Sequence, residues 1–420
     1  MSKHKRDYDV FKGLLNGQQV NTLSHDQIQA VVLGKAQTST KGSTRLLVLH
    51  DGCDIRKPNS SELEYLGNVM SLQKNVINGY KSMESVVIDP DNQTLDLVFQ
   101  ELYSNKHPNF VSQEMVNNPD LASPQQLALI QSGEYINTKT LYHKSINESH
   151  KCLKMLNPDV VLTHISDREF DDSEDFKMID DLGDEFVTRL KLSRLSNELS
   201  TCYTPKGKIS KRQKAVKLID KKFAHQGEYT VAKLIIKGKT YLNAIVRIEW
   251  EDLQLDENSY TVLRVTLMQS NKKNIFEHPM LLITNRLIDS QAIAKEVYHA
   301  YIARFKIEIV FKFIKQNLGL ETFQVRDWES IKNILALCFF LVGYFKELEE
   351  ELKNHPIAQY LAQLALSKGK VTSFFLLKGL EKIANFIEVK QLIDQNVITQ
   401  DQIDDLLEKI GFKNQLIRSS

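Results

Sequence analysis

The sequence predicts an α/β protein whose core sheet is interrupted by a β-rich insertion and completed by long helices. Two short apolar runs, at 45–50 and 159–165, have the length of buried strands, and each is followed by an aspartate. Several β-branched and aromatic runs, separated by turn signals, fill residues 229–284. From Ser290 onward the apolar residues recur with the period of a helix.

The remaining elements follow in chain order from the same patterns. Helical patterns occupy 9–15 and 24–33, with Ser24 as an N-cap, and a polar turn ends this region at 37–43. The segment 67–92 supplies further strands, 111–156 is mostly helical, and a strand at 186–192 precedes a basic loop. Strands of the insertion are predicted at 229–236, 241–250, 260–268 and 280–284, and the clearest helix at 290–317.

Composition bounds the class of protein. The chain has 420 residues, 42% of them hydrophobic and 25% charged, which is typical of a globular protein with two or three domains. The four cysteines are far apart, so a disulfide framework or zinc cluster is not indicated, and a reducing cytosol is the expected compartment. The longest apolar run, 334–345, is too short to cross a bilayer and predicts a buried helix.

The charge of the chain is segregated along the sequence. The net charge is only +1, but the segment from Arg189 to Lys222 holds eleven Lys/Arg and two Asp/Glu. The segment before it, 167–184, is strongly acidic. Because binding to nucleic acid depends on where charge is placed, the basic segment indicates a polyanionic partner despite the near-neutral total.

One face of the predicted helix at 290–317 carries an unusual set of side chains. Tyr301, Arg304, Glu308, Lys312 and Lys315 are spaced 3, 4, 4 and 3 residues apart and fall within a sector of roughly 80°. A single carboxylate among cations and a phenol suggests a metal ligand set among phosphate-binding groups. The alternative, which spacing alone favours, is an ordinary surface with i,i+4 ion pairs. The apolar residues on the neighbouring faces are expected in the core: Ile302, Phe305, Ile309, Val310 and Phe313.

Two aspartates follow the predicted buried strands. Asp51 ends the first strand and Asp167 follows the second. The carboxyl ends of strands in α/β sheets form ligand sites, and carboxylates from separate elements can hold two divalent cations for phosphodiester chemistry. Asp51, Asp167 and Glu308 fit this description. For either aspartate alone a turn-forming or N-capping role is the stronger interpretation, and Asp54 is an alternative to Asp51.

The motifs resemble those of a known family. Residues 301–315 fit the pattern Y-(2)-R-(3)-E-(6)-K, 166–171 contain a D-R-E motif, and 50–54 resemble a first-aspartate region. In this combination and order the segments are similar to the DDE transposases of the insertion-sequence-4 family. The resemblance covers roughly residues 40–345, including a long gap between Asp167 and Glu308 that holds a β-rich insertion in that family.

The resemblance implies an RNase H-like fold, in which a mixed sheet is flanked by helices and interrupted by the insertion. It also implies a division of the chain. The expected parts are a short helical N-terminal region at 1–40, the first part of the catalytic core at 41–185, the insertion at 186–288, the completion of the core at 289–345, and a helical C-terminal region at 346–420.

The resemblance also implies roles for individual residues. Asp51, Asp167 and Glu308 would be catalytic and would hold two Mg²⁺ or Mn²⁺ ions. Glu169 would support the site, and the basic segment 206–222 would bind DNA electrostatically. The residues expected to contact DNA are Tyr301, Arg304, Lys312, Lys315, Arg168 and Arg189.

The implied partners are double-stranded DNA at the terminal inverted repeats of a mobile element and the target DNA. Two DNA ends must be held together, so a homodimer is expected, in the cytoplasm at the nucleoid. The chain departs from the family in having only 50 residues before Asp51, and in carrying Met280 where hairpin-forming relatives have a base-stacking tryptophan. Three alternatives stay open: a metal-dependent nuclease without strand transfer, a truncated or domesticated relative that binds DNA without cutting, and a structural α/β protein.

Overall fold

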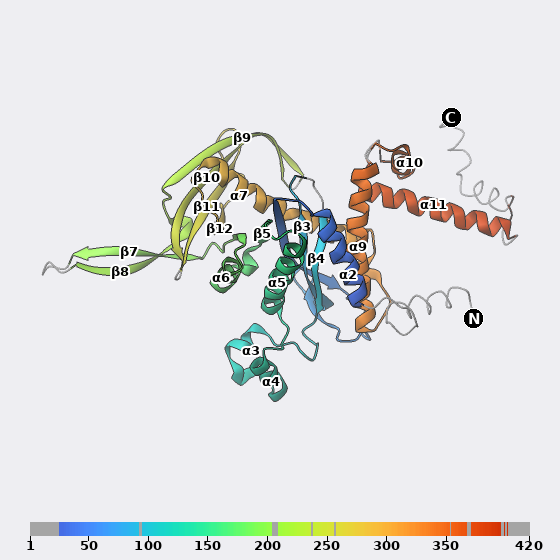
Figure 1. Cartoon of the computed structure of the whole chain (residues 1–420), viewed down its shortest axis with the longest axis horizontal. Coiled ribbons are helices and arrows are strands. Elements are labelled where there is room, and N and C mark those ends of the chain that lie inside the picture. Colours follow the sequence, from blue (N-terminus) through green and yellow to red (C-terminus); the bar gives the residue numbers. More distant parts are fainter. Residues whose placement is uncertain are drawn as a thin grey trace. The chain divides into compact units, whose positions relative to one another are not determined.

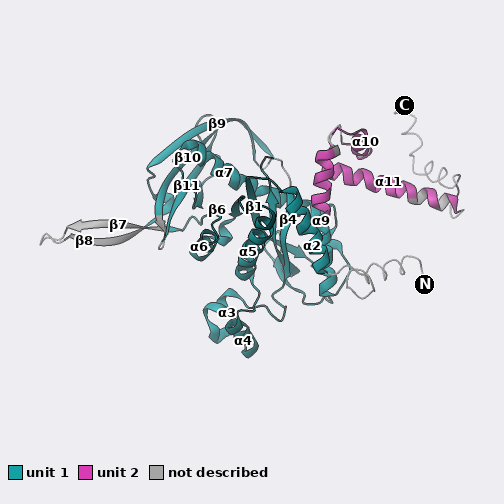
Figure 2. Ribbon diagram, in the orientation of Figure 1, with its two compact units in different colours: residues 1–340 teal, residues 341–420 magenta. Residues whose placement is uncertain are grey.

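The computed structural model describes residues 25–91, 95–203, 209–236, 238–255, 258–352, 354–367, 371–395, 399 and 401. It divides the chain into two compact units, Met1–Phe340 and Leu341–Ser420 (Figure 2). The expected helix at 9–15 and the Ser24 cap lie outside the described residues. The finer division of the chain stays a prediction.

Unit 1 is built on a long mixed sheet. Its described strands are β1 Arg45–Arg56, β2 Gly67–Met70, β3 Val76–Ile88, β4 Leu95–Tyr103, β5 Val161–Ser166, β6 Glu185–Arg189, β9 His225–Ile236, β10 Lys239–Leu255, β11 Asn258–Met268 and β12 Met280–Thr284. Their order is β2-β3-β1-β5-β6-β12-β11-β10-β9, with β4 also paired to β3. A separate hairpin consists of β7 Leu195–Tyr203 and β8 Ile209–Lys217.

The sheet combines a parallel centre with antiparallel flanks. Strands β1, β5 and β6 are parallel neighbours, while β3 pairs with β1 and β12 pairs with β6 in antiparallel fashion. The strands of the insertion therefore extend the central sheet. The α/β class and the four predicted insertion strands are confirmed, whereas β4 was not predicted and the expected basic loop contains the hairpin β7–β8.

Helices cover both faces of the central strands (Figure 1). The described helices are α2 His25–Ser39, α3 Gln113–Asn117, α4 Pro124–Ser132, α5 Thr138–Leu156, α6 Ser173–Asp181, α7 Gln291–Ala303, α8 Phe305–Gln316, α9 Trp328–Leu352, α10 Pro356–Leu364 and α11 Ser373–Asp394. Side chains alternate along β1, so Leu46 and Val48 point to one face and join Ala36 of α2 and Leu153 of α5 in a buried cluster. Asp51 points to the other face, where α8 contacts β1.

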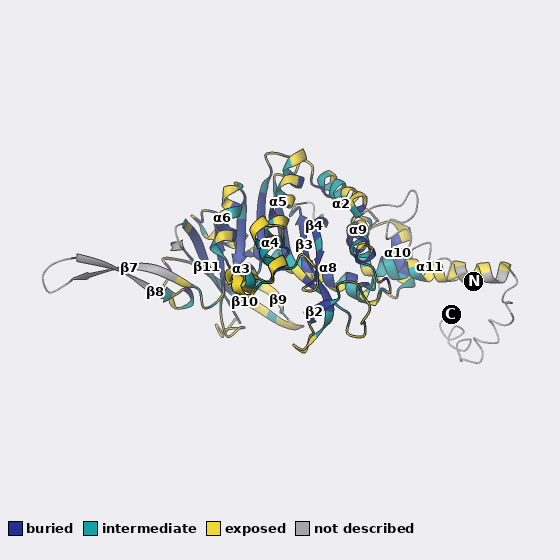
Figure 3. Cartoon of the chain, turned by 90° about the horizontal axis from the view of Figure 1, so that it is seen from below, coloured by how far each residue is buried: buried dark blue, intermediate teal, exposed yellow. Residues whose placement is uncertain are grey.

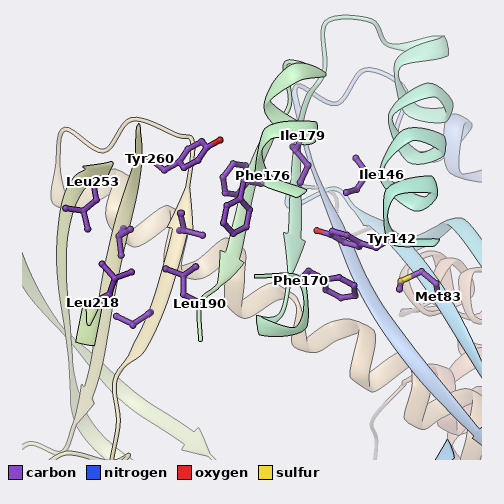
Figure 4. Close-up of a cluster of buried hydrophobic side chains, with 14 of the residues drawn as sticks. Met83, Tyr142, Ile146, Phe170, Phe176, Ile179, Leu190, Leu218, Leu253 and Tyr260 are labelled. Carbon is purple, nitrogen blue, oxygen red and sulfur yellow. The ribbon is translucent and has the colours of Figure 1, made fainter. Parts of the chain in front are cut away.

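A second apolar cluster joins the first half of unit 1 to the insertion strands. Figure 4 shows its side chains, including Tyr142 of α5 and Phe170, whose rings stack with centroids 3.9 Å apart. Phe176 of α6 stacks on Phe186 of β6, and the edge of Tyr260 on β11 meets both rings. In Figure 3 the strands of the sheet are coloured largely dark blue, the colour of buried residues. The shared core ties the insertion strands to the strands that carry the candidate site.

The first buried strand is longer than the sequence predicted. β1 continues through Asp51 to Arg56, so Asp51 lies within the strand and does not end it. The physical reason is that pairing to β3 goes on after pairing to β5 has stopped at Leu49. Asp51 therefore has a strand partner on one side only.

The helix predicted at 290–317 is two helices, α7 and α8, which meet at Arg304. The Arg304 amide donates to the Tyr301 carbonyl, and the Ile307 amide donates to the Arg304 carbonyl, both at 3.0 Å. This spacing of three residues is that of a tight 3₁₀ turn and interrupts the α-helical ladder.

The break also corrects the expected core face of this segment. Phe305 and Ile309 are 40% and 67% exposed, whereas Val310 is buried and Ile302 and Phe313 are half-buried. The predicted core face assumed one straight helix. The tight turn at Arg304 changes the direction in which α8 presents its side chains, so the prediction fails at Phe305 and Ile309.

Unit 2 contains the end of α9 with α10 and α11. Gly379 of α11 lies so close to the Leu361 backbone of α10 that a larger side chain would collide with it. The Ser373 hydroxyl donates to Glu349 at 2.6 Å. The apolar run 334–345 is helical as predicted, but Leu341 and Tyr344 are exposed. In the described part of the chain, no helix has the length and apolar character needed to span a membrane.

Candidate active site

The sheet register brings the two aspartates to the same end of neighbouring strands. Parallel pairing of β1 with β5 ends at Leu49 beside Ile165, and Asp51 and Asp167 each lie two residues beyond that pair. One oxygen of Asp167 accepts from the Glu169 amide at 2.8 Å and caps the short helix η2, Arg168–Phe170. The capping interpretation of Asp167 is thus correct, and it leaves the second carboxylate oxygen for other contacts.

Arg304 joins the first aspartate to the glutamate. Its guanidinium donates to Asp51 Oδ2 and to Glu308 Oε1, at 2.7 Å in each case. The Arg304 side chain is 6% exposed, that of Asp51 21% and that of Glu308 50%. Asp54, three residues after Asp51 on the same strand, points to the opposite face. The structure therefore brings the side chain of Asp51, and not that of Asp54, to Arg304 and Glu308.

The carboxylates at this point repel one another. The pKa of Asp51 is raised to about 6, chiefly by burial, with Arg304 opposing the shift and the carboxylates of Asp167 and Glu308 adding to it. Three acidic side chains from β1, the turn after β5, and α8 therefore act on one another electrostatically. A cation placed among them would relieve this repulsion, and here the cation is a guanidinium.

Two buried donors at the site have no partner. The Tyr301 hydroxyl and Arg304 Nε are buried, and neither has a hydrogen-bond partner among the described residues. Burial raises the pKa of Tyr301, and the cations of Arg304 and Arg189 oppose this shift, which places Arg189 near the phenol. The phenol and the Arg304 guanidinium also act on one another electrostatically.

The other cations predicted for DNA differ in placement. Lys312 is exposed on α8. Lys315 turns inward, where its amine donates to the Asp54 carbonyl at 2.6 Å and lies 3.7 Å from Glu321. In this arrangement Lys315 fixes α8 to the end of β1.

Arg168 and Glu169 are exposed at the rim of the site. With Asp167 they line a surface pocket of about 650 Å³, whose other wall is Lys191, Leu192 and Ser193. Sequence reasoning counted Lys191 only within the basic segment. Its place two residues after Arg189, where β6 has just ended, was the signal that could have identified it.

A buried polar chain lies beneath the aspartates on the other face of the sheet. His50 Nε2 and His164 Nδ1 are 2.8 Å apart, and His164 Nε2 is 3.1 Å from Asp184 Oδ2. The hydroxyls of Ser85 and Ser145 reach His50 Nδ1 at 2.7 and 2.9 Å. Both histidines are fully buried, so they are packed strand residues under the site. Burial holds the pKa of His50 well below its usual value.

One further carboxylate near the site was not predicted. Glu84 on β3 is the cross-strand neighbour of Asp51 and is fully buried. Burial raises its pKa to about 8, Asp51 adds to the shift, and nearby Ser82 and Lys315 oppose it. A single glutamate inside a strand is a weak sequence signal, because its strand partner is unknown until the register is known.

The donor set fits a hard divalent cation in chemistry. Carboxylate oxygens are the ligands that Mg²⁺ and Mn²⁺ prefer, and Asp167 and Glu308 both act electrostatically on Asp51. Among the described residues, however, no group of three or more His, Cys, Asp or Glu side chains is arranged to hold a metal ion. The Arg304 guanidinium occupies one oxygen of Asp51 and one of Glu308.

A comparison with known protein families gives a match over part of the chain. Residues 141–342 match the model of the transposase DDE domain. The matched segment contains Asp167 and Glu308 and begins after Asp51. The match supports a transposase function in general, and with it DNA processing, DNA transposition and recombination. A search of curated proteins found no match.

Proposed function

We propose that this protein is a transposase of the insertion-sequence-4 family, which cleaves DNA at the ends of an insertion sequence and transfers the strands to target DNA in a metal-dependent reaction. The observation that carries the proposal is the convergence of Asp51, Asp167 and Glu308 around Arg304. A salt-bridged helix surface alone would not draw in a half-buried strand carboxylate such as Asp51.

The three acids would hold two Mg²⁺ or Mn²⁺ ions. Such ions, when bound, lower the pKa of an attacking water and stabilise the leaving oxygen of a phosphodiester. Arg304 would release Asp51 and Glu308 and turn toward a DNA phosphate, together with the unpartnered Tyr301 hydroxyl. In this view Arg304 is the internal counter-ion of the acidic centre before DNA binds. The freed 3′-hydroxyl of the element end would then attack target DNA in the same site.

The remaining cations of the site face the path of DNA in this proposal. Lys312, Arg168 and Arg189 would contact phosphates around the cut, with Lys191 beside them, and Glu169 would support the turn at Asp167. Lys315 would reach DNA only by leaving the Asp54 carbonyl, so we assign it first to holding α8 in place.

The sheet supports an RNase H-like core as part of the same proposal. Parallel β1, β5 and β6 with antiparallel β3, covered by helices on both faces, place the acids at one end of the central strands. The partners would be double-stranded DNA at terminal inverted repeats and target DNA, held by a homodimer, in the cytoplasm at the nucleoid.

The test is metal-dependent cleavage of DNA that carries the ends flanking the gene. The native chain is compared with Glu308→Gln, and with Glu296→Gln as a matched change on the exposed face of α7. We expect cleavage in Mg²⁺ by the native chain and by Glu296→Gln, and a loss of cleavage in Glu308→Gln with DNA binding retained, because the Glu308 side chain is half exposed.

The products decide between the proposal and its rivals. Joined target DNA supports strand transfer, whereas cleavage without joining indicates a nuclease. Binding without cleavage by the native chain indicates a DNA-binding relative. Equal cleavage by the native chain and Glu308→Gln would show that the acidic centre is not the catalytic one.

A further inference from the structure

Glu84 lies in line with Asp51 across the sheet. The two residues are direct partners in the antiparallel pairing of β3 with β1, so their side chains project from the same face. Gln100 of β4 is the partner of Glu84 on its other side. Asp51, Glu84 and Gln100 therefore form a row of polar side chains that leads from the acidic centre into the sheet, and the last two are buried.

The inner part of this row consists of buried polar side chains. Neither carboxylate oxygen of Glu84, and neither amide atom of the Gln100 side chain, has a hydrogen-bond partner in the part of the chain that the structure describes. A buried carboxylate without a partner is among the most unfavourable groups in a protein interior. Its presence beside Asp51 points to a group that enters from outside and satisfies it.

The nearest alternatives within the chain are directed elsewhere. The Lys315 amine, which acts on Glu84 electrostatically, donates to the Asp54 carbonyl at 2.6 Å. The Ser82 hydroxyl is directed to the Cys53 carbonyl at 3.4 Å. Ser82 is a neutral hydroxyl near Glu84 and supplies no charge, and no ion pair joins the Lys315 amine to Glu84 among the described residues.

We propose that Glu84 is a fourth carboxylate of the acidic centre and contributes an oxygen to the divalent cation bound by Asp51, directly or through one water ligand of that cation. The inference rests on the proposed function, because it assumes a cation at Asp51. Gln100 would then hold Glu84 from behind. Glu84 would act with Asp51 as one unit on β1 and β3, which the continuous pairing of these strands keeps in register.

The test measures Mn²⁺ binding by the full-length chain, using calorimetry and the unfolding temperature with and without Mn²⁺. The variants are Glu84→Gln and, as a second change that keeps the volume and removes the polarity, Glu84→Met. The control is Glu101→Gln on β4, one residue from Gln100 and so on the opposite face, where Glu101 pairs with Lys144.

We expect both Glu84 variants, without metal, to unfold at or above the temperature of the native chain, because each removes a buried carboxylate that has no partner. Their Mn²⁺ affinity should fall by about tenfold or more, as for other groups that support a metal. Glu101→Gln should bind Mn²⁺ as the native chain does.

Unchanged Mn²⁺ affinity in a folded Glu84 variant would overturn the assignment of Glu84 while leaving the proposed function intact. Absence of Mn²⁺ binding by the native chain would overturn both. Native binding of Mn²⁺ without DNA cleavage would count against the proposed reaction only, and the comparison of Glu84 variants would still decide the role of this residue.

Discussion

Arg304 and His50 make polar contacts on opposite faces of the central sheet, at strands β1 and β5. Arg304 lies on the helix side, where it holds Asp51 and Glu308. His50, the next residue to Asp51, points to the other side, where it connects β1 to β5 through His164. Asp184, the residue before β6, continues the chain of contacts to His150 of α5. The strands that present Asp51 and Asp167 are thus fixed by polar contacts on both faces.

His50 is neutral in the folded chain, and this makes the free energy of unfolding depend on pH. Its pKa in the folded chain is well below 6.5, while in the unfolded chain it is ordinary, so the unfolded chain binds the extra proton below pH 6.5. The contribution to stability is complete above pH 6.5 and is lost as the pH falls below it. The slope is at most about 1.4 kcal/mol per pH unit.

This prediction is checked by urea unfolding of the native chain and His50→Gln between pH 7.5 and 5 (a range set by the ordinary histidine pKa of about 6.5). As the pH falls, the unfolding free energy of the native chain should decrease more steeply than that of His50→Gln. The difference in slope should correspond to about one proton. His278→Gln, at an exposed position, should keep the native slope. Parallel curves for the native chain and His50→Gln would refute the neutral state of His50.

At the scale of elements, the break between α7 and α8 decides which side chains reach the site. Tyr301 and Arg304 end up buried beside Asp51, whereas Glu308 and Lys312 lie on the outer side of α8. The same turn leaves Ile309 exposed while Ile307 is fully buried. The residues of the signature therefore divide into a buried group and an exposed group. The Glu308 side chain, which is half exposed, lies between them.

Alanine substitutions on α8 test this orientation. Ile307→Ala removes a fully buried side chain and should cost about 2–4 kcal/mol of unfolding free energy. Ile309→Ala removes an exposed side chain and should change the free energy of unfolding by no more than about 0.5 kcal/mol. Chemical unfolding monitored by circular dichroism measures both, and a larger cost for Ile309→Ala would show that α8 is oriented differently.

At the scale of the whole molecule, the central sheet and the insertion form one continuous structure. β12 pairs with β6, and an apolar cluster continues from α5 to β11, so the insertion strands are anchored to the strands of the candidate site. The hairpin β7–β8 leaves this sheet and carries the densest part of the basic segment. Under the proposed function, the hairpin and the candidate site would contact DNA as parts of the same unit.

The basic segment should make DNA binding strongly dependent on salt. Replacing Lys211, Arg212 and Lys214 together by glutamine removes three charges from β8. The slope of log affinity against log salt should become shallower by about 2 to 3, because each lost phosphate contact removes roughly 0.9. Fluorescence anisotropy at several salt concentrations measures it, with Lys41, Lys74 and Lys151, which are exposed elsewhere, changed in the same way as a control. Equal slopes for the two triple variants would exclude the hairpin as the main contact.

The sequence by itself determined the class of the fold, the strands at 160–165 and 229–284, and the candidate acids. These follow from local patterns, because a buried strand or an amphipathic helix is written in the spacing of its own apolar residues. The four-residue signature on α7 and α8 gave Tyr301, Arg304, Glu308 and Lys315 without knowledge of their surroundings.

Only the tertiary structure decided which of these residues meet and through what contacts. The register of β1 with β3 and β5 placed the Asp51 side chain on the face that Arg304 contacts, made the buried Glu84 its cross-strand neighbour, and set Asp51 near Asp167. The tight turn at Arg304 exposed Phe305 and Ile309 and directed the guanidinium to two carboxylates. Strand register and helix direction depend on contacts between residues far apart in the chain, so no local pattern contains them.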